Sequence, residues 1–121
     1  MKYLCLIYDE ERDWDAMPAA ESAAYLAECM AVEGEVRAAG VYRAGEALYP
    51  AATAAIVRIR NGRLSTTDGP FAETKEQLGG FYLVEARDRD EAVRIAAKIP
   101  AARTGCVEVR PVMDFGQQSQ G

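Results

Sequence analysis

Two parts of the chain repeat the same order of elements. Lys2–Tyr8 is apolar on both alternating sets of side chains, which is typical of a strand covered on two faces. The Ala-rich segment Ala19–Ala39 carries apolar residues at helical spacing and predicts a long amphipathic helix. Gly80–Ala86 again indicates a strand, and apolar residues between Asp88 and Pro100 predict a second helix. The chain is therefore expected to fold as two halves that each begin with a strand and a helix.

Further strands complete these halves. Asn61 and Gly62 tolerate positive φ angles, so they predict a two-residue hairpin turn. The order of elements predicts the α+β class, as a ferredoxin-like βαββαβ arrangement with an added hairpin. The additional strands are expected over four segments: Val41–Leu48, Ala54–Arg60, Arg63–Thr67 and Cys106–Val112.

Two helices can cover only one face of such a sheet. At 121 residues the chain is near the low end of what can bury both faces alone. Because a large uncovered apolar face is unusual for a monomer, we expect a homodimer in which two sheets face one another. The alternation does not say which side chains lie on that face, because no register is known. We expect one domain over residues 1–115 and a polar, frayed tail over residues 116–121.

Composition excludes several classes of function. A net charge of −5 repels phosphate backbones and anionic lipid, so nucleic acid is not an expected partner. No apolar run is long enough to cross a membrane and no leader is recognised, which favours a cytoplasmic protein. The absence of histidine excludes imidazole-based triads and the usual zinc ligands, and we predict no cofactor or metal. The widely spaced Cys5, Cys29 and Cys106 are expected to be reduced core residues.

The densest group of turn formers and reactive side chains is Thr67–Gly80. Asp68 could serve there as a general base, although a bond from its carboxylate to the backbone of the Gly69-Pro70-Phe71 turn is the favoured alternative. Lys75 could orient an anionic substrate or hold Asp68 in place. The alternative is a solvated Lys75, or one paired with Glu73 or Glu76.

Other candidate ligand contacts lie on the predicted strands and in the turn. Tyr8 and Tyr82 are expected on adjacent strands, where their hydroxyls could line a pocket or simply pack in the core or dimer interface. Glu46 could face the same cleft, or remain an edge-strand carboxylate in water. Phe71 is expected mainly as an anchor that ties the turn to the core, worth about 3 kcal/mol if its ring is buried. The turn contributes three ligand-binding candidates: Gly69, Pro70 and Phe71.

The run Asp-Gly-Pro-Phe-Ala-Glu-Thr-Lys-Glu at residues 68–76 resembles the YCII-related family, in its Asp-Gly-Pro-Phe branch. Lys2-Tyr3-Leu4 and Val107-Glu108-Val109-Arg110-Pro111 match as well. The resemblance implies a dimeric α+β barrel. It also implies that some relatives use a His–Asp acid/base pair on small molecules, which this histidine-free chain cannot carry over. Members of the branch are often encoded beside extracytoplasmic-function sigma factors, which implies a regulatory or accessory setting.

Two functions follow from these observations. One is a small-molecule pocket protein that performs lyase or isomerase-type chemistry, with Asp68 as the base and Lys75 or an arginine as the anion stabiliser. The other is a non-catalytic accessory module that binds a protein of a sigma-factor system. The sequence does not decide whether the chain is an enzyme.

Overall fold

The computed structural model describes residues 1–116, so the predicted polar tail lies outside the described residues beyond Gly116. Four strands form an antiparallel sheet in the order β2-β5-β1-β6, and β3 and β4 form a separate two-stranded sheet. This confirms the α+β class and the ferredoxin-like βαββαβ arrangement with its added hairpin. The elements are β1 Lys2–Glu10, α1 Ala19–Ala38, β2 Tyr42–Ala47, the 3-10 turn η1 Ala51–Thr53, β3 Ala55–Arg60, β4 Arg63–Asp68, β5 Glu76–Glu85, α2 Arg89–Ala96, α3 Ala101–Thr104 and β6 Cys106–Pro111.

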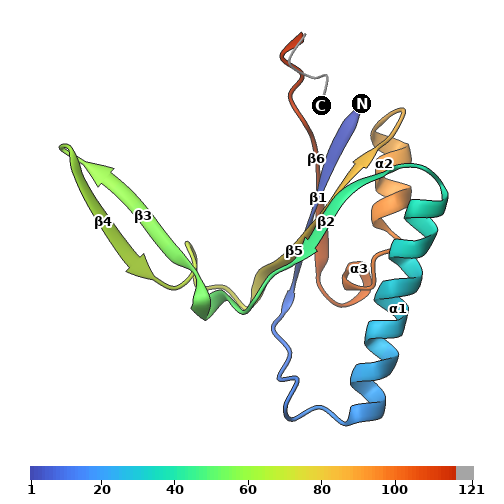
Figure 1. The fold of residues 1–121 in the computed structure, drawn as a ribbon, viewed down its shortest axis with the longest axis horizontal. Coiled ribbons are helices and arrows are strands. Elements are labelled where there is room, and N and C mark those ends of the chain that lie inside the picture. The colour runs from blue at the N-terminus through green and yellow to red at the C-terminus, as the bar shows by residue number, and fades with distance from the viewer. Residues whose placement is uncertain (117–121) are drawn as a thin grey trace.

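All three α-helices lie on one side of the four-stranded sheet, and the other side is uncovered (Figure 1). Tyr3 and Cys5 are 5% and 0% exposed, so their set of side chains faces the helices. The alternate set therefore lies on the uncovered side. Because Leu4 pairs with Leu83 and Leu6 with Phe81, these residues share that side. We call it the open face, and it consists chiefly of Leu4, Leu6, Tyr8, Phe81 and Leu83.

The core lies between the helices and the covered face of the sheet. Val36 of α1 and Val84 of β5 are 1% and 0% exposed, and they pack in the same cluster as Cys5. Apolar residues that follow β5 complete this layer: Ala86, Ala92, Ile95, Ala96, Ile99 and Ala101. No helix within residues 1–116 is long and apolar enough to cross a membrane.

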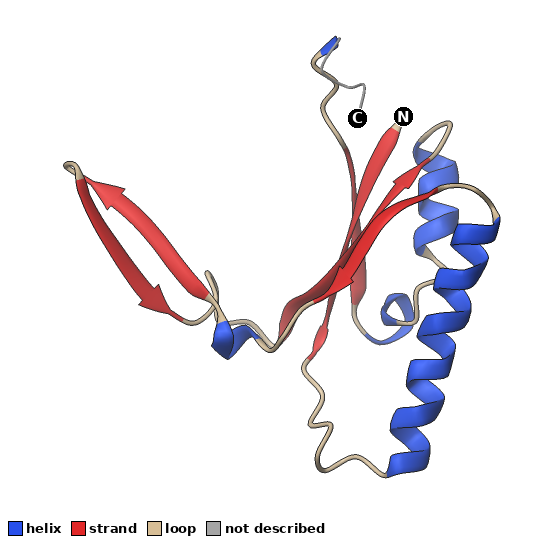
Figure 2. Ribbon diagram, viewed as in Figure 1, coloured by secondary structure: helices blue, strands red, loops and turns tan. Residues whose placement is uncertain are grey.

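The β3–β4 hairpin, residues 55–68, projects away from the sheet on its uncovered side (Figures 1 and 2). We call it the arm. Asn61 and Gly62 have φ angles of 52° and 74°, which confirms the predicted two-residue turn. The two strands pair residue by residue from Ala55 opposite Asp68 to Arg60 opposite Arg63.

Two predicted boundaries are wrong. β5 begins at Glu76 rather than at Gly80, because the polar residues at its start pair with the end of β1 beyond the predicted strand. The second helix was expected to continue up to Pro100, but α2 ends at Ala96. Pro100 has a different place in the structure. It caps the short helix α3, since a proline is tolerated where a helix begins.

Asp88 caps α2 as its spacing to Glu91 suggests. One Asp88 carboxylate oxygen accepts a hydrogen bond from the Glu91 amide at 2.9 Å, and Glu91 Oε1 accepts one from the Arg87 amide at 2.8 Å. We expect Asp88→Ala to lower the free energy of unfolding by about 1 kcal/mol, measured by urea denaturation. The matched control is Asp90→Ala. Asp90 lies two residues further along, in the first turn of α2, and its removal leaves the cap intact. Equal losses from both changes would contradict the capping role.

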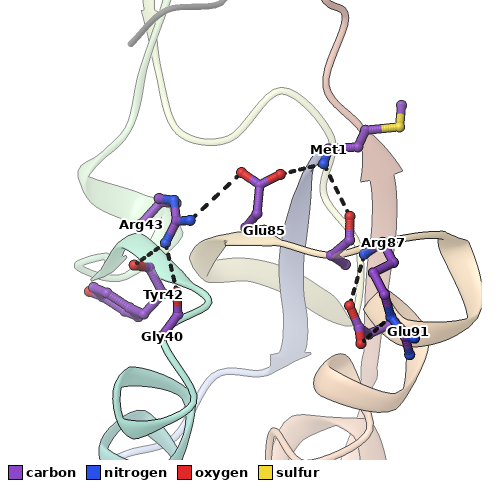
Figure 3. A network of polar contacts seen from close by, with 8 residues as sticks. Met1, Gly40, Tyr42, Arg43, Glu85, Arg87 and Glu91 are labelled. Atoms are coloured by element: carbon purple, nitrogen blue, oxygen red, sulfur yellow. Dashed lines mark hydrogen bonds and ion pairs between the residues drawn. The ribbon is translucent and has the colours of Figure 1, made fainter.

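Polar contacts tie the ends of three strands together where the chain starts (Figure 3). The Met1 amine donates hydrogen bonds to the Glu85 carboxylate and, at 3.1 Å, to the Ala86 carbonyl. Arg43 Nη2 lies 3.8 Å from the other Glu85 oxygen, and Arg43 Nη1 donates to the Gly40 carbonyl at 3.0 Å. The hydrogen bond from the amine is the main reason that the pKa of Glu85 is lowered.

Candidate functional site

The loop between β4 and β5 lies between two open hollows that share Thr74 and Lys75. We call one of them the loop hollow, with a volume of about 530 Å³, and the other the sheet hollow, with a volume of about 540 Å³. The sheet hollow is lined by Tyr8, Glu10, Thr74, Lys75, Glu76 and Cys106. The loop hollow is lined by Glu11, Ala51, Ala52, Asp68, Gly69, Pro70, Glu73, Thr74, Lys75 and Gln77.

Gln77 holds the loop in shape. Its side-chain amide donates hydrogen bonds to the Ala72 carbonyl at 3.1 Å and to the Thr74 carbonyl at 2.9 Å. At the other end of the loop, the Gly69 amide donates to the Ala54 carbonyl at 2.8 Å, and Gly69 has a φ of 103° that favours glycine. Gln77 is not among the residues predicted from sequence, because nothing in the spacing of a glutamine at the start of a strand indicates these contacts.

Glu11 builds the opposite wall of the loop hollow. Its Oε2 accepts a hydrogen bond from the Ala51 amide at 2.6 Å, which ties the segment after β1 to η1. The Leu48 amide donates to the Gly79 carbonyl at 2.9 Å and fixes the same corner to β5. Forty positions separate Glu11 from Ala51, so no local pattern could have predicted this contact.

Asp68 ends β4 opposite Ala55, with an exposed side chain that lines the loop hollow. Its carboxylate accepts no hydrogen bond from any of residues 1–116, so the favoured bond to the turn backbone is absent. The turn is shaped instead by the positive φ of Gly69. The oxygens of Asp68 are therefore available to solvent or to a ligand.

Lys75 lies between the two hollows and is 81% exposed at its side chain. Its Nζ is 3.9 Å from Glu10 Oε2, and it forms no ion pair with Glu73 or Glu76 within residues 1–116. Lys75 is therefore largely solvated, as one alternative expected, and its contact is with Glu10 rather than Glu73 or Glu76 because the end of β1 lies next to the loop. An exposed ammonium therefore lies at the rim that both hollows share.

Tyr8 and Tyr82 lie on opposite faces of the sheet, so they do not line one pocket, and Tyr82 packs against the core as the alternative expected. Tyr82 faces the helices, where its ring packs edge to face on Tyr42 at 5.8 Å. Burial, followed by the nearby Glu33 carboxylate, raises the pKa of Tyr82 to about 12. Tyr8 is on the open face, where its hydroxyl donates to Glu108 Oε1 at 3.4 Å. Only Tyr8 belongs to the candidate site.

Glu46 and Phe71 do not line either hollow. Glu46 is an exposed carboxylate on the edge strand β2, as the alternative interpretation had it. Phe71 is 82% exposed, so the expected anchor to the core is wrong. Since its ring is not buried in this chain, Phe71→Ala is expected to change the stability of the isolated chain little.

The three cysteines are free, but only Cys5 is a core residue. Burial raises the pKa of the Cys5 thiol to about 11. Cys29 is partly exposed and Cys106 is exposed, and Cys106 lines the sheet hollow beside Tyr8. The expectation of a buried Cys106 is wrong because the first residues of β6 run along an edge of the sheet.

A ferredoxin-like α+β fold with an uncovered sheet face and a hollow beside its central loop defines the class of this protein. The chain belongs to the YCII-related family, since the sequence model of the YCII-related domain matches residues 1–116. It is 38% identical over 114 residues to an uncharacterized protein of Rhizobium meliloti (strain 1021). That alignment covers 93% of this chain and 92% of the relative.

Proposed function

We propose that this protein binds a small polar molecule in the loop hollow and moves a proton on it. The observation that supports this most directly is that Asp68 and Lys75, from the two ends of one loop, line the same hollow. Its volume of about 530 Å³ lies within the range of small-molecule pockets. The loop is held by Gln77 and Gly69, so these side chains project from an ordered support.

The charges of the hollow suit a ligand with both a donor group and a negative group. The Asp68 carboxylate has no protein donor within residues 1–116, so it can accept a proton from the ligand. Lys75 provides an ammonium on the same rim. In the step that we propose, Asp68 removes a proton from a carbon beside a carbonyl, and the electron pair moves onto the carbonyl oxygen near Lys75. The electron pair then returns from the oxygen and the same carbon takes up a proton, which restores the carbonyl; uptake on the opposite face of that carbon completes an isomerisation by inverting it.

We further propose that the protein acts as a homodimer through its open face. Leu4, Leu6, Phe81 and Leu83 share that face and no helix of the chain covers it. A second copy that lays the same face against it would bury this apolar surface.

The proposed site is tested with Asp68→Asn and the matched control Glu46→Gln, an exposed carboxylate that lines neither hollow. The probes are small hydroxy acids, keto acids and amino acids, screened by ligand-observed NMR, with exchange of ligand protons followed in deuterated water. For any molecule that binds, we expect Asp68→Asn to lower exchange at least 100-fold and Glu46→Gln to leave it within twofold of the unchanged protein. Equal effects of the two changes would refute the site, and the absence of any binder would favour the accessory module instead.

A further inference from the structure

The arm has one apolar face that nothing in the chain buries. Val57, Ile59 and Leu64 are 60%, 65% and 68% exposed. Ile59 lies opposite Leu64, and Val57 is two residues before Ile59, so all three project from the same side of the hairpin. A two-stranded hairpin alone is at best marginally stable in water, so the arm is expected to gain stability from a surface that packs against it.

The other face of the arm is basic. Arg60 lies directly opposite Arg63, and Arg58 is two residues before Arg60 on the same side. Like charges that face each other across two strands are destabilising. None of these three guanidinium groups forms an ion pair with a carboxylate of residues 1–116, and Arg60 donates only to the neighbouring Ile59 carbonyl, at 3.1 Å. An acidic surface from outside the chain would therefore stabilise this face.

The chain itself carries an acidic surface at one end of its open face. Glu10 lies directly opposite Glu76, which is again a pair of like charges across two strands. Glu108 is on the same face, nearer the middle of the sheet, because it pairs with Leu6, and its Oε2 lies 3.9 Å from Arg110 Nε. The only ion pair of Glu10 within residues 1–116 is the 3.9 Å contact with the exposed Lys75. We call Glu10, Glu76 and Glu108 the acidic end.

We propose that the arm docks on a second copy of this chain, with Arg58, Arg60 and Arg63 set against the partner's acidic end. Each copy then supplies one arm and one acidic end, so two equivalent contacts form across a two-fold axis. Because Glu10 and Glu76 also line the sheet hollow, the partner's arm supplies a wall that this hollow lacks in one chain. This assignment rests on the homodimer proposed above but not on the proton transfer, and its test needs no ligand.

The dimensions allow this contact. Each strand of the arm has six residues, which at about 3.4 Å per residue gives an arm about 20 Å long. Two sheets packed face to face are about 10 Å apart, so an arm that projects on the uncovered side extends past the facing sheet. The arm leaves the sheet at the end that carries Glu10 and slants toward the end where the chain starts (Figure 1). If the strands of the partner run antiparallel to those of the first copy, the partner's acidic end lies where the first chain starts. The tip of the arm slants toward that place.

Two charge-reversed chains test the contact. The arm variant carries Arg58→Glu and Arg60→Glu, and it leaves Arg63 as an opposite charge across from residue 60. The acidic-end variant carries Glu10→Lys and Glu108→Lys, and it likewise leaves Glu76 opposite residue 10. The arm variant creates no new like-charged pair across its two strands. The acidic-end variant places its new lysines near Lys75 and Arg110, which lie 3.9 Å from Glu10 and Glu108 in the unchanged protein. Circular dichroism checks that both chains fold. The control, Arg89→Glu with Arg94→Glu, makes the same change in net charge as the arm variant on α2.

Sedimentation velocity and native mass spectrometry give the result. We expect each reversed chain alone to dimerise at least tenfold more weakly than the unchanged protein, and the α2 control to dimerise as the unchanged protein does. An equal mixture of the two reversed chains should form mainly heterodimers, because each arm then meets an oppositely charged acidic end. The proposal is overturned if the arm variant dimerises like the α2 control, if the mixture forms no heterodimers in excess, or if the unchanged protein is monomeric at tens of micromolar.

Discussion

Leu6→Asp should convert the homodimer that we propose to a monomer, with a dimer dissociation constant raised at least 100-fold, or about 2.8 kcal/mol. Leu6 lies in β1, at the centre of the open face beside Phe81. In a dimer formed by this face, the new carboxylate would lose its water without gaining a counter-charge. In the isolated chain it remains partly exposed, so folding of the monomer should be affected much less. Sedimentation equilibrium at several concentrations measures the change.

The matched control is Leu26→Asp, which makes the same substitution on α1. Leu26 is 53% exposed, on the element that covers the other face of the sheet. We expect this change to leave the dimer dissociation constant within about threefold of its original value. A Leu6→Asp protein that still dimerises like the Leu26→Asp protein would show that the open face is not the interface. Unlike the charge-reversal test, this comparison concerns the sheet alone and leaves the arm intact.

Local patterns in the sequence were enough to predict the elements of the fold. The strand at β1, the long helix and the Asn61-Gly62 turn each depend on residues close in the chain, and the structure forms all three. The sequence does not predict which face of β1 is covered. The alternation of side chains along a strand allows either face, and the choice depends on pairings such as that of Leu6 with Phe81, seventy-five positions later. For the same reason, Tyr8 and Tyr82 could not be placed on opposite faces from sequence.

The errors at the site have a common physical origin. Phe71 and Cys106 were expected to be buried because they are apolar, but an apolar residue type only favours burial and much apolar surface stays exposed in folded chains. Asp68 and Lys75 were found from their place in one loop, which is local information. Glu11 and Gln77 shape the same hollow through contacts that depend on how β1, η1 and β5 meet, so only the structure could identify them.

Gly105→Ala should be the most destabilising of the single changes considered for the isolated chain, with a loss on the order of 3 kcal/mol. A β-carbon at Gly105 would lie 2.1 Å from the Tyr8 carbonyl oxygen and 2.9 Å from Asp9 Cα. Both are backbone atoms of β1, so the clash can be relieved only by moving the strand away from the start of β6. The same shift would displace Tyr8 and Cys106, which line the sheet hollow. Urea denaturation measures the loss of stability.

Gly34→Ala is the control, because it makes the same substitution where the structure has room. Gly34 lies inside α1, and a β-carbon there would have no atom within 4 Å other than those of its chain neighbours and the nearby backbone of the same helix. Alanine loses less backbone entropy than glycine when a helix forms, so this change should raise stability by about 0.5 to 1 kcal/mol. The two substitutions should therefore differ in sign as well as in size. If Gly105→Ala stayed within 1 kcal/mol of the unchanged protein, the close contact between β1 and β6 would not be what positions Tyr8 at the sheet hollow.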